Sequence, residues 1–389
     1  MTRRLTVLCV VACMSVMVAP SAARASGAWT VETTPTGDGV TLTALSCFSN
    51  GCIAVGLYDT GDAAVYGWNG STWAALPVPA KPLLDTMNGV ACSSSSDCIA
   101  VGHLHESQGW RAQAWSWNGS AWSVQATFNP PSSHNSLNAI RCAAGTSSCE
   151  AVGYRGYGGP TYPLAEYWNG RAWAYQSTKR APIGDLMSLS CAGRGASLGA
   201  CEAVGQNGFS FTALAMGLNG STWITQATPA LPHNDQSDGP AELTAVSCYR
   251  SGCMAVGWES YSDGTPDSSG NQSVGELWNG SKWTLAGVPY RDYTSDTPTA
   301  VNCRSASSCT AVGWLLTCGD CVDYTDTLVL SWDGTQWTQA TAPSPNDSLA
   351  MTFPGDALNA VACVSGVCTA VGQQPDVSTG FPDSLAIQS

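Results

Sequence analysis

The amino-acid sequence predicts an all-β protein, a seven-bladed β-propeller with four short strands in each blade. Three observations predict it: a phrase with two cysteines occurs seven times, a tryptophan phrase recurs between the cysteine pairs, and each end of the chain holds only part of a repeat. A fixed internal period decides the architecture before any single residue is given a role.

The first two strands of each repeat flank a cysteine pair. In "LTAVSCYRSGCMAVG", residues 243–257, one apolar run ends at a cysteine and the next begins at one, which is typical of two strands joined by a tight turn. The first cysteines of the seven phrases are Cys47, Cys92, Cys142, Cys191, Cys248, Cys303 and Cys363. The period is therefore about fifty residues, the length of a four-stranded propeller blade.

The third and fourth strands flank an Asn-Gly or Asp-Gly turn. In "WNGSKW", residues 278–283, this dipeptide lies between apolar residues and predicts a hairpin with a type I′ turn, which has positive φ at both central residues. The second tryptophan marks the fourth strand, and seven residues share this position: Trp29, Trp73, Trp122, Trp173, Trp223, Trp283 and Trp337.

The two ends of the chain complete one blade together. Residues 384–389, "SLAIQS", occupy the place of a third strand, and residues 26–35, "SGAWTVETTP", resemble the fourth strand that is missing there. We expect the mature N-terminal strand to pair with the C-terminal strand and close the ring, which removes exposed strand edges. An open solenoid is the competing architecture and predicts distinct capping repeats at both ends.

The N-terminus has the features of a secretory signal peptide. A basic start, an apolar run and Ala23-Arg24-Ala25 predict cleavage after Ala25, with residues 26–389 forming a single propeller domain. Cys13 would also fit a lipoprotein signal, but the apolar "MSVMVAP" that follows it favours full cleavage. We therefore expect a secreted, extracellular protein.

Charge and hydropathy exclude some partners. The formal net charge of −13 argues against nucleic acid and anionic membranes as partners. Beyond the signal peptide, no apolar run approaches the ~20 residues that a membrane span needs. We expect a monomer with no cofactor.

The cysteine pairs are predicted to form disulfides. Facing residues at a hairpin mouth have Cα atoms about 5 Å apart, a separation that a disulfide accepts, and an exported protein favours oxidation. The predicted pairs are Cys47/Cys52, Cys92/Cys98, Cys142/Cys149, Cys191/Cys201, Cys248/Cys253, Cys303/Cys309 and Cys363/Cys368. Cys318 and Cys321 fall outside the pattern and suit a local disulfide, a redox pair or a metal site, in that order.

The predicted binding surface is the face that carries the long, varied loops between the second and third strands and between blades. Aromatic side chains beside polar groups on this face suit sugar rings or protein partners. The predicted ligand-binding residues are Trp258, Trp314, Tyr154, Tyr261, Tyr290, Glu259, Asp263, Arg291 and Asp292.

Two alternatives remain for residues on this face. Trp258 and Trp314 directly follow "AVG" and could instead pack between blades, as tryptophan often does. His103 and His105 with Glu106 could hold a metal ion, although histidines in such a loop more often face solvent. No residue is assigned to catalysis or to metal binding.

The combined pattern L-x-A-V-S-C, C-x-A-V-G and W-N-G-x-x-W resembles the repeats of secreted, cysteine-paired β-propeller proteins of actinobacterial type. The resemblance covers the whole mature chain and implies the fold and export. That group is largely without assigned function, so the resemblance carries over no catalytic residue.

The favoured function is a non-enzymatic binding module for carbohydrate or a cell-surface protein. A propeller glycoside hydrolase or polysaccharide lyase is the first alternative and would need two carboxylates about 5–9.5 Å apart in a cleft. A structural surface protein is the second alternative.

Overall fold

The computed structural model describes residues 28–35, 37–78, 85–107, 109–130, 134–143, 146–156, 159–193, 197–208, 211–231, 240–262, 269–288, 294–319, 322–345, 355–376 and 378–389. The predicted signal peptide, residues 1–25, lies outside this part of the chain. None of the described residues belongs to a helix long and apolar enough to cross a bilayer.

The described residues form antiparallel four-stranded sheets in which the strands follow one another in chain order. One sheet contains β2 (Val40–Phe48), β3 (Gly51–Tyr58), β4 (Ala63–Trp68) and β5 (Trp73–Ala75). Another contains β14 (Gly184–Cys191), β15 (Cys201–Asn207), β16 (Thr212–Asn219) and β17 (Thr222–Gln226). A third contains β18 (Ala241–Tyr249), β19 (Gly252–Ser262), β20 (Ser269–Trp278) and β21 (Trp283–Leu285). A fourth contains β22 (Thr294–Ser305), β23 (Ser308–Gly319), β24 (Val322–Trp332) and β25 (Trp337–Gln339).

An eight-stranded sheet contains two such meanders. The first consists of β6 (Asp85–Ser94), β7 (Asp97–Glu106), β8 (Gly109–Trp117) and β9 (Trp122–Gln125). The second consists of β10 (His134–Cys142), β11 (Cys149–Gly156), β12 (Thr161–Trp168) and β13 (Trp173–Tyr175). A single parallel pair, His134 with Trp110, joins them.

One four-stranded sheet unites the two ends of the chain. Its strands are β26 (Ala357–Val364), β27 (Val367–Pro375), β28 (Pro382–Gln388) and β1 (Thr30–Glu32). Thr30 pairs with Gln388 and Glu32 with Ala386. This is the pairing of N-terminal and C-terminal strands that the sequence predicts.

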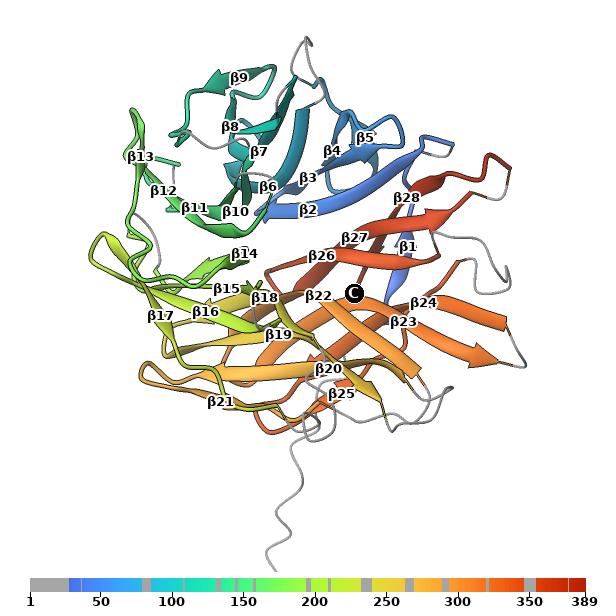
Figure 1. The fold of residues 1–389 in the computed structure, drawn as a ribbon. Coiled ribbons are helices and arrows are strands. Elements are labelled where there is room, and N and C mark those ends of the chain that lie inside the picture. The colour runs from blue at the N-terminus through green and yellow to red at the C-terminus, as the bar shows by residue number, and fades with distance from the viewer. Residues whose placement is uncertain are drawn as a thin grey trace, which may run out of the picture.

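The sheets are arranged around the middle of the molecule in a propeller-like manner (Figure 1). The first strand of each meander faces the centre, and residues of β2, β6, β10, β14, β18, β22 and β26 line one central cavity of about 660 Å³. The last strands, such as β5 and β13, lie outermost and are largely exposed.

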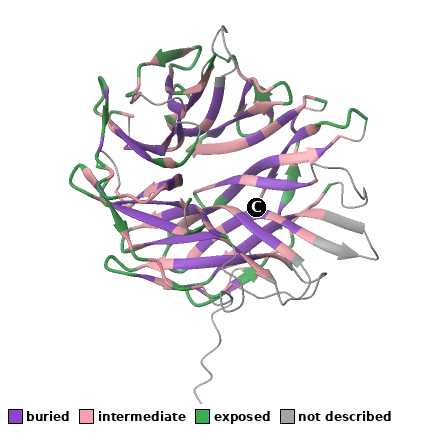
Figure 2. Cartoon of the chain, in the orientation of Figure 1, coloured by how far each residue is buried: buried purple, intermediate pink, exposed green. Residues whose placement is uncertain are grey.

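The hydrophobic core consists of layers between neighbouring sheets, seen as the buried middle strands in Figure 2. The layer between the first and last sheets combines Leu42, Ala54 and Tyr66 with Val371 and Ala386. Small and branched side chains alternate along the inner strands, so each sheet buries both faces against its neighbours.

The glycine of each "AVG" phrase is required by the close approach of the first strand. A Cβ atom on Gly56 would lie 2.0 Å from the carbonyl oxygen of Thr41, and one on Gly257 would lie 1.9 Å from that of Glu242. A β-bulge follows at the same level of the first strand, between Leu42 and Ala44 and between Leu243 and Ala245. Only glycine lets the two backbones approach this closely.

The Asn-Gly hairpins form, but the predicted type I′ turn is wrong. Trp68 pairs directly with Trp73, so the loop has four residues, and Gly70 has a positive φ of 96° while Asn69 does not have a positive φ. The Asn69 side chain instead accepts hydrogen bonds from the backbone N–H groups of Ser71 and Thr72. This Asx geometry satisfies the turn without a second left-handed residue.

All seven predicted cysteine pairs at the first hairpins form disulfides. The bonded pairs are Cys47–Cys52, Cys92–Cys98, Cys142–Cys149, Cys191–Cys201, Cys248–Cys253, Cys303–Cys309 and Cys363–Cys368. Cys321 and the side chain of Cys318 lie outside the described residues. Seven disulfides indicate an oxidising compartment.

The surroundings of these disulfides correct the prediction in two respects. The paired Cα atoms lie only 3.9–4.0 Å apart, closer than the predicted separation of about 5 Å, because directly facing residues of an antiparallel hairpin approach most closely where they exchange no backbone hydrogen bonds. The second cysteine is also buried, with exposed fractions of 4% for Cys52, 1% for Cys98 and 5% for Cys368. These three belong to hydrophobic layers between sheets. The disulfides are therefore part of the core as well as covalent links, which the spacing of the cysteines did not predict.

Removing one disulfide is expected to lower the free energy of unfolding by about 2 kcal/mol, because closing so short a loop restricts the unfolded chain only modestly. Cys248→Ala/Cys253→Ala tests this by denaturant unfolding without reductant. Most of the difference from wild type should disappear when both proteins are fully reduced. Equal stability under oxidising conditions would mean that the hairpin needs no covalent link.

Candidate functional site

Aromatic and imidazole rings gather where β7, β8, β10 and β11 meet. The indole of Trp110 stacks on His103 at 4.8 Å between ring centroids, and His134 and Tyr154 meet it edge-on at 5.2 and 6.4 Å. His105 lies 5.5 Å from the same indole. Three of the four histidines of the chain therefore surround one tryptophan. We call these five residues the aromatic cluster.

A pocket of about 280 Å³ opens beside the aromatic cluster. Its walls are Trp110, His134, Tyr154, Gly156, Gly159, Thr161 and Asp185. The walls come from the end of the second strand β11, the beginnings of the first strands β10 and β14, the beginnings of the third strands β8 and β12, and the loop that holds Gly159. The pocket therefore lies on the face that carries the long loops. Gly156 and Gly159 bring backbone rather than side chains to the wall, which keeps the pocket open.

Asp185 supplies a carboxylate to this pocket. Its Oδ1 atom is buried and has no hydrogen-bond partner among the described residues, while the Thr161 hydroxyl bonds the carboxylate. Burial raises the pKa of Asp185 and outweighs the opposing effect of that hydrogen bond. An unpaired buried acceptor is costly, and a ligand hydroxyl would satisfy it.

Tyr154 and His103 are neutral at physiological pH. Burial, followed by the charge of Asp185, raises the pKa of Tyr154 to about 12. Burial, followed by repulsion from His105, lowers the pKa of His103 to about 4. His103 lies 3.1 Å from the Ser136 hydroxyl through Nδ1 and 3.3 Å from Nε2 of His105 through its own Nε2. These contacts hold the ring against Trp110.

The geometry suits a single sugar ring. Indole and phenol faces pack against apolar C–H groups, and Asp185 Oδ1 accepts from a hydroxyl. The volume lies slightly below the roughly 300–1,000 Å³ of pockets for drug-sized ligands. Among the described residues, no three histidine, cysteine or carboxylate side chains are placed to hold a metal ion, His103, His105 and Glu106 included.

The structure brings one of the sequence-predicted ligand residues, Tyr154, into this pocket. Trp258 and Trp314 are half-buried, occupy the same strand position as Tyr154 in other sheets, and do not line the pocket. Glu259 is only 2% exposed, and Tyr261 is half-buried at the end of β19. Four predicted residues lie outside the described part: Asp263, Tyr290, Arg291 and Asp292.

Sequence reasoning missed Trp110, His134 and Asp185 as members of one site. They come from three connections that are far apart in the chain, and only the packing of neighbouring sheets brings them together. One usable signal exists for Asp185, which shares its strand position with Glu242. At the same strand position, four other meanders have hydroxyl side chains: Thr41, Thr86, Ser136 and Thr297. A carboxylate at this position therefore departs from the repeat.

No protein-family model matches the chain, and no curated protein matches it. Solved structures do match. The structure described as "YCF48 bound to D1 peptide" is 16% identical, with a TM-score of 0.52, and the match covers 92% of this chain and 94% of that chain. At this identity the similarity shows the fold alone, the propeller-like assembly of four-stranded sheets.

A fucose-specific lectin from Aleuria aurantia is 11% identical, with a TM-score of 0.46 and coverage of 77% of this chain and 95% of that chain. A mutant of the same lectin in complex with alpha-methyl-L-fucoside is 12% identical, with a TM-score of 0.45 and coverage of 77% and 94%. These weaker similarities carry no argument about the pocket.

Proposed function

We propose that this protein is a secreted, non-enzymatic binding module that holds carbohydrate in the pocket beside Trp110. The observation that carries the proposal is the unpaired, buried Oδ1 of Asp185 in a pocket walled by Trp110 and Tyr154. A neutral sugar offers a hydroxyl for this oxygen and an apolar ring face for the aromatic walls. The predicted signal peptide and the seven disulfides support secretion.

The proposal includes a closed, seven-bladed propeller as the rigid frame of the pocket. One hydrogen-bond pattern supports closure. Asn138 Nδ2 donates to the carbonyl oxygen of Leu186 in the next sheet at 2.9 Å, and Asn359 Nδ2 donates to that of Leu42 at 2.9 Å. The second bond joins the last sheet to the first in the way that the other bond joins consecutive sheets. An open solenoid offers no reason for this contact.

Binding to a glycan panel tests the function. Trp110→Ala and Asp185→Ala are each expected to weaken binding of the selected sugar about tenfold or more, because they remove the stacking surface and the hydroxyl acceptor. Phe381→Ala is the matched control, since Phe381 is 51% exposed on another long hairpin and does not line the pocket. Binding that survives both pocket substitutions would contradict the proposal.

A glycoside hydrolase or lyase is the second candidate, and one observation favours it. Burial, followed by the charge of Asp185, raises the pKa of Glu242, so the carboxyl group that lines the pocket interacts electrostatically with a second one. Product analysis of the same incubations separates the two functions. Released sugar that is abolished by Glu242→Gln while binding persists would establish the enzyme.

A further inference from the structure

The central cavity carries positive charge in an acidic protein. Among its described lining residues, the charged side chains are Arg141, Arg250 and Arg304, and no carboxylate is present. The whole chain has 28 acidic and 15 basic side chains, so three arginines without one acid is the opposite of the average surface. The cavity residues otherwise carry small hydroxyl, amide and apolar side chains.

Arg141 is the long side chain that departs from the repeat. It directly precedes the first cysteine of its sheet, where the other six sheets have Ser46, Ala91, Ser190, Ser247, Asn302 and Ala362. Several of these small residues serve the neighbouring backbone: Ser247 Oγ, for example, accepts from the N–H of Cys303 at 2.8 Å. Arg141 instead contributes a long, charged side chain to the lining of the cavity.

The Arg141 side chain is exposed where the two hollows meet it, and it has no ion pair or hydrogen bond among the described residues. Its surface is accessible from the cavity, but burial lowers its pKa because the enclosing strands remove hydrating water. A neighbouring hollow of about 580 Å³ near the cysteine turns also contains Arg141 as its one charged residue. Arg141 therefore lines both the central cavity and this hollow, and neither has an acidic side chain among its described lining residues.

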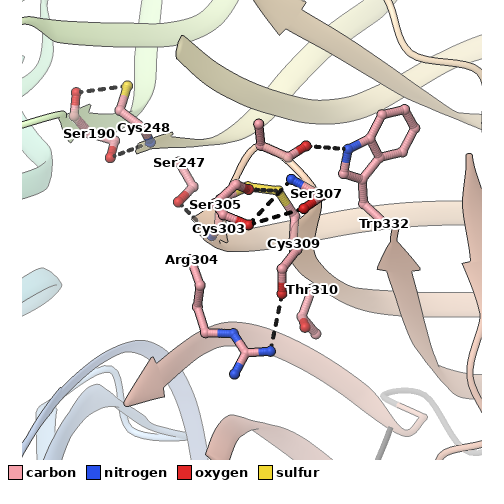
Figure 3. Close-up of a disulfide and its surroundings, with 12 residues drawn as sticks. Ser190, Ser247, Cys248, Cys303, Arg304, Ser305, Ser307, Cys309, Thr310 and Trp332 are labelled. Carbon is pink, nitrogen blue, oxygen red and sulfur yellow. Dashed lines mark hydrogen bonds between the residues drawn. A yellow bond between two sulfur atoms is a disulfide. The ribbon is translucent and has the colours of Figure 1, made fainter. Parts of the chain in front are cut away.

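Arg250 and Arg304 belong to two adjacent sheets and lie at the same end of the cavity. Arg304 donates to Ser308 Oγ at 3.1 Å, which occupies one nitrogen and leaves other N–H groups available. Figure 3 shows the Arg304 side chain directed away from the Cys303–Cys309 disulfide. It reaches Gly366 at the next cysteine turn, since a Cβ atom there would lie 3.7 Å from Arg304 Nη1.

We propose that the cysteine-turn end of the central cavity binds a small oxyanion with several negative oxygens, a phosphate or a polycarboxylate. Arg141 belongs to β10, Arg250 directly follows β18 and Arg304 belongs to β22, and all three line the same cavity, so a multivalent anion there can meet more than one guanidinium. Arginine is suited to this role because its planar N–H groups bind carboxylate and phosphate oxygens in pairs. The site shares no residue with the pocket beside Trp110.

Calorimetric titration of the mature protein with citrate and with inorganic phosphate, at low ionic strength, tests this site. We expect wild type to bind at least one of the two anions and Arg141→Gln to bind it about tenfold more weakly or worse. Arg171→Gln is the matched control: it makes the same charge change on an exposed turn and should bind like wild type. If Arg141→Gln does not fold, Arg304→Gln provides the same comparison.

Three results would overturn the proposal. The first is that wild type binds neither anion, and the second is that wild type and the cavity variant bind equally well. The third is that Arg171→Gln weakens binding as much as Arg141→Gln does, which would indicate general attraction to positive charge. Asp185→Ala should leave anion binding unchanged. The anion site and the carbohydrate pocket can therefore fail independently.

Discussion

Replacing Glu276 with glutamine is expected to make the folded protein more stable at pH 9 and to change its stability little at pH 4. Glu276 lies in β20 opposite Ala255, and its side chain is 0% exposed. Neither carboxyl oxygen has a hydrogen-bond partner among the described residues. Burial alone therefore raises the pKa of this carboxyl to about 8.

The direction of the pH effect follows from proton binding. The ordinary pKa is 4.5, so between pH 4.5 and about 8 the folded protein holds a proton that the unfolded chain releases. Stability contributed by this group is fully present below pH 4.5 and is lost as the pH rises through about 8. Glutamine cannot titrate, so this part of the fall in stability with rising pH is absent from the variant.

One pKa unit corresponds to about 1.4 kcal/mol, so the shift sets an upper limit of about 5 kcal/mol on the penalty at high pH. Water entry and local rearrangement reduce the penalty for a buried charge, and we expect a gain of about 2 kcal/mol at pH 9. Urea unfolding at pH 4, 6, 8 and 9 measures it. Glu166, which has the equivalent position in β12 and also a pKa raised to about 8 by burial, should behave in the same direction.

Glu106→Gln is the matched control, because it makes the same chemical change on an exposed side chain. Parallel pH profiles for wild type and Glu276→Gln would contradict the prediction and would mean that the carboxylate gains water or a partner without disturbing the fold.

Regularity in the sequence accounts for what could be predicted. The hairpins, the disulfides and the pairing of the two chain ends depend on local spacing or on repeated phrases, so Cys248 and Cys253 or residues 26–35 could be placed without knowledge of the neighbours. The reason for the "AVG" glycine could not be predicted, because it depends on how closely Thr41 O approaches Gly56. The burial of Cys98 likewise depends on the layer that the next sheet completes.

The distinctive chemistry lies where the repeats differ. Glu166 and Glu276 occupy a position filled by Tyr66, Trp115, Met216, Leu330 and Ile387 in other sheets. Arg141 likewise replaces a small residue. The sequence reveals such departures only when the repeats are compared position by position, and their consequences depend on burial and on neighbours from other sheets. The pocket beside Trp110 is another such departure, because its residues differ from those of the other repeats and come together only through the packing of neighbouring sheets.

Replacing Asp38 with alanine is expected to destabilise the protein by about 3 kcal/mol, because Asp38 fastens the two ends of the chain to each other. Its carboxylate accepts hydrogen bonds from the Tyr66 hydroxyl at 2.9 Å and from the Ser384 hydroxyl at 2.7 Å. It also accepts from the backbone N–H groups of Ser384 and Val40. We call this set of contacts the terminal latch.

The large effect follows from what alanine leaves behind. Tyr66 is 2% exposed and Ser384 is 0% exposed, so both hydroxyls would lose their acceptor in a place that water reaches poorly. An unsatisfied buried donor costs about 1–3 kcal/mol, and bonds to a charged acceptor are at the upper end. Burial and the nearby Asp38 both raise the pKa of Tyr66, so the phenol stays a donor to the carboxylate.

Asp376→Ala is the matched control. It shows how much stability is lost when an aspartate with several hydrogen bonds is removed at a place that does not join the two ends of the chain. Asp376 is half-buried at its hairpin and accepts hydrogen bonds from the Ser378 N–H, the Ser378 hydroxyl and the Thr379 hydroxyl, all within that hairpin. Its removal should cost under about 1 kcal/mol.

If the terminal latch closes a ring, Asp38→Ala should also accelerate amide exchange in β1 and β28, because the contact between the chain ends opens before the other sheets do. A closed ring then explains why one carboxylate matters more than its four hydrogen bonds in isolation: losing it exposes two strand edges and the hydrophobic layer between the first and last sheets. Equal stability of Asp38→Ala and Asp376→Ala, with unchanged exchange in β1, would contradict closure through this contact.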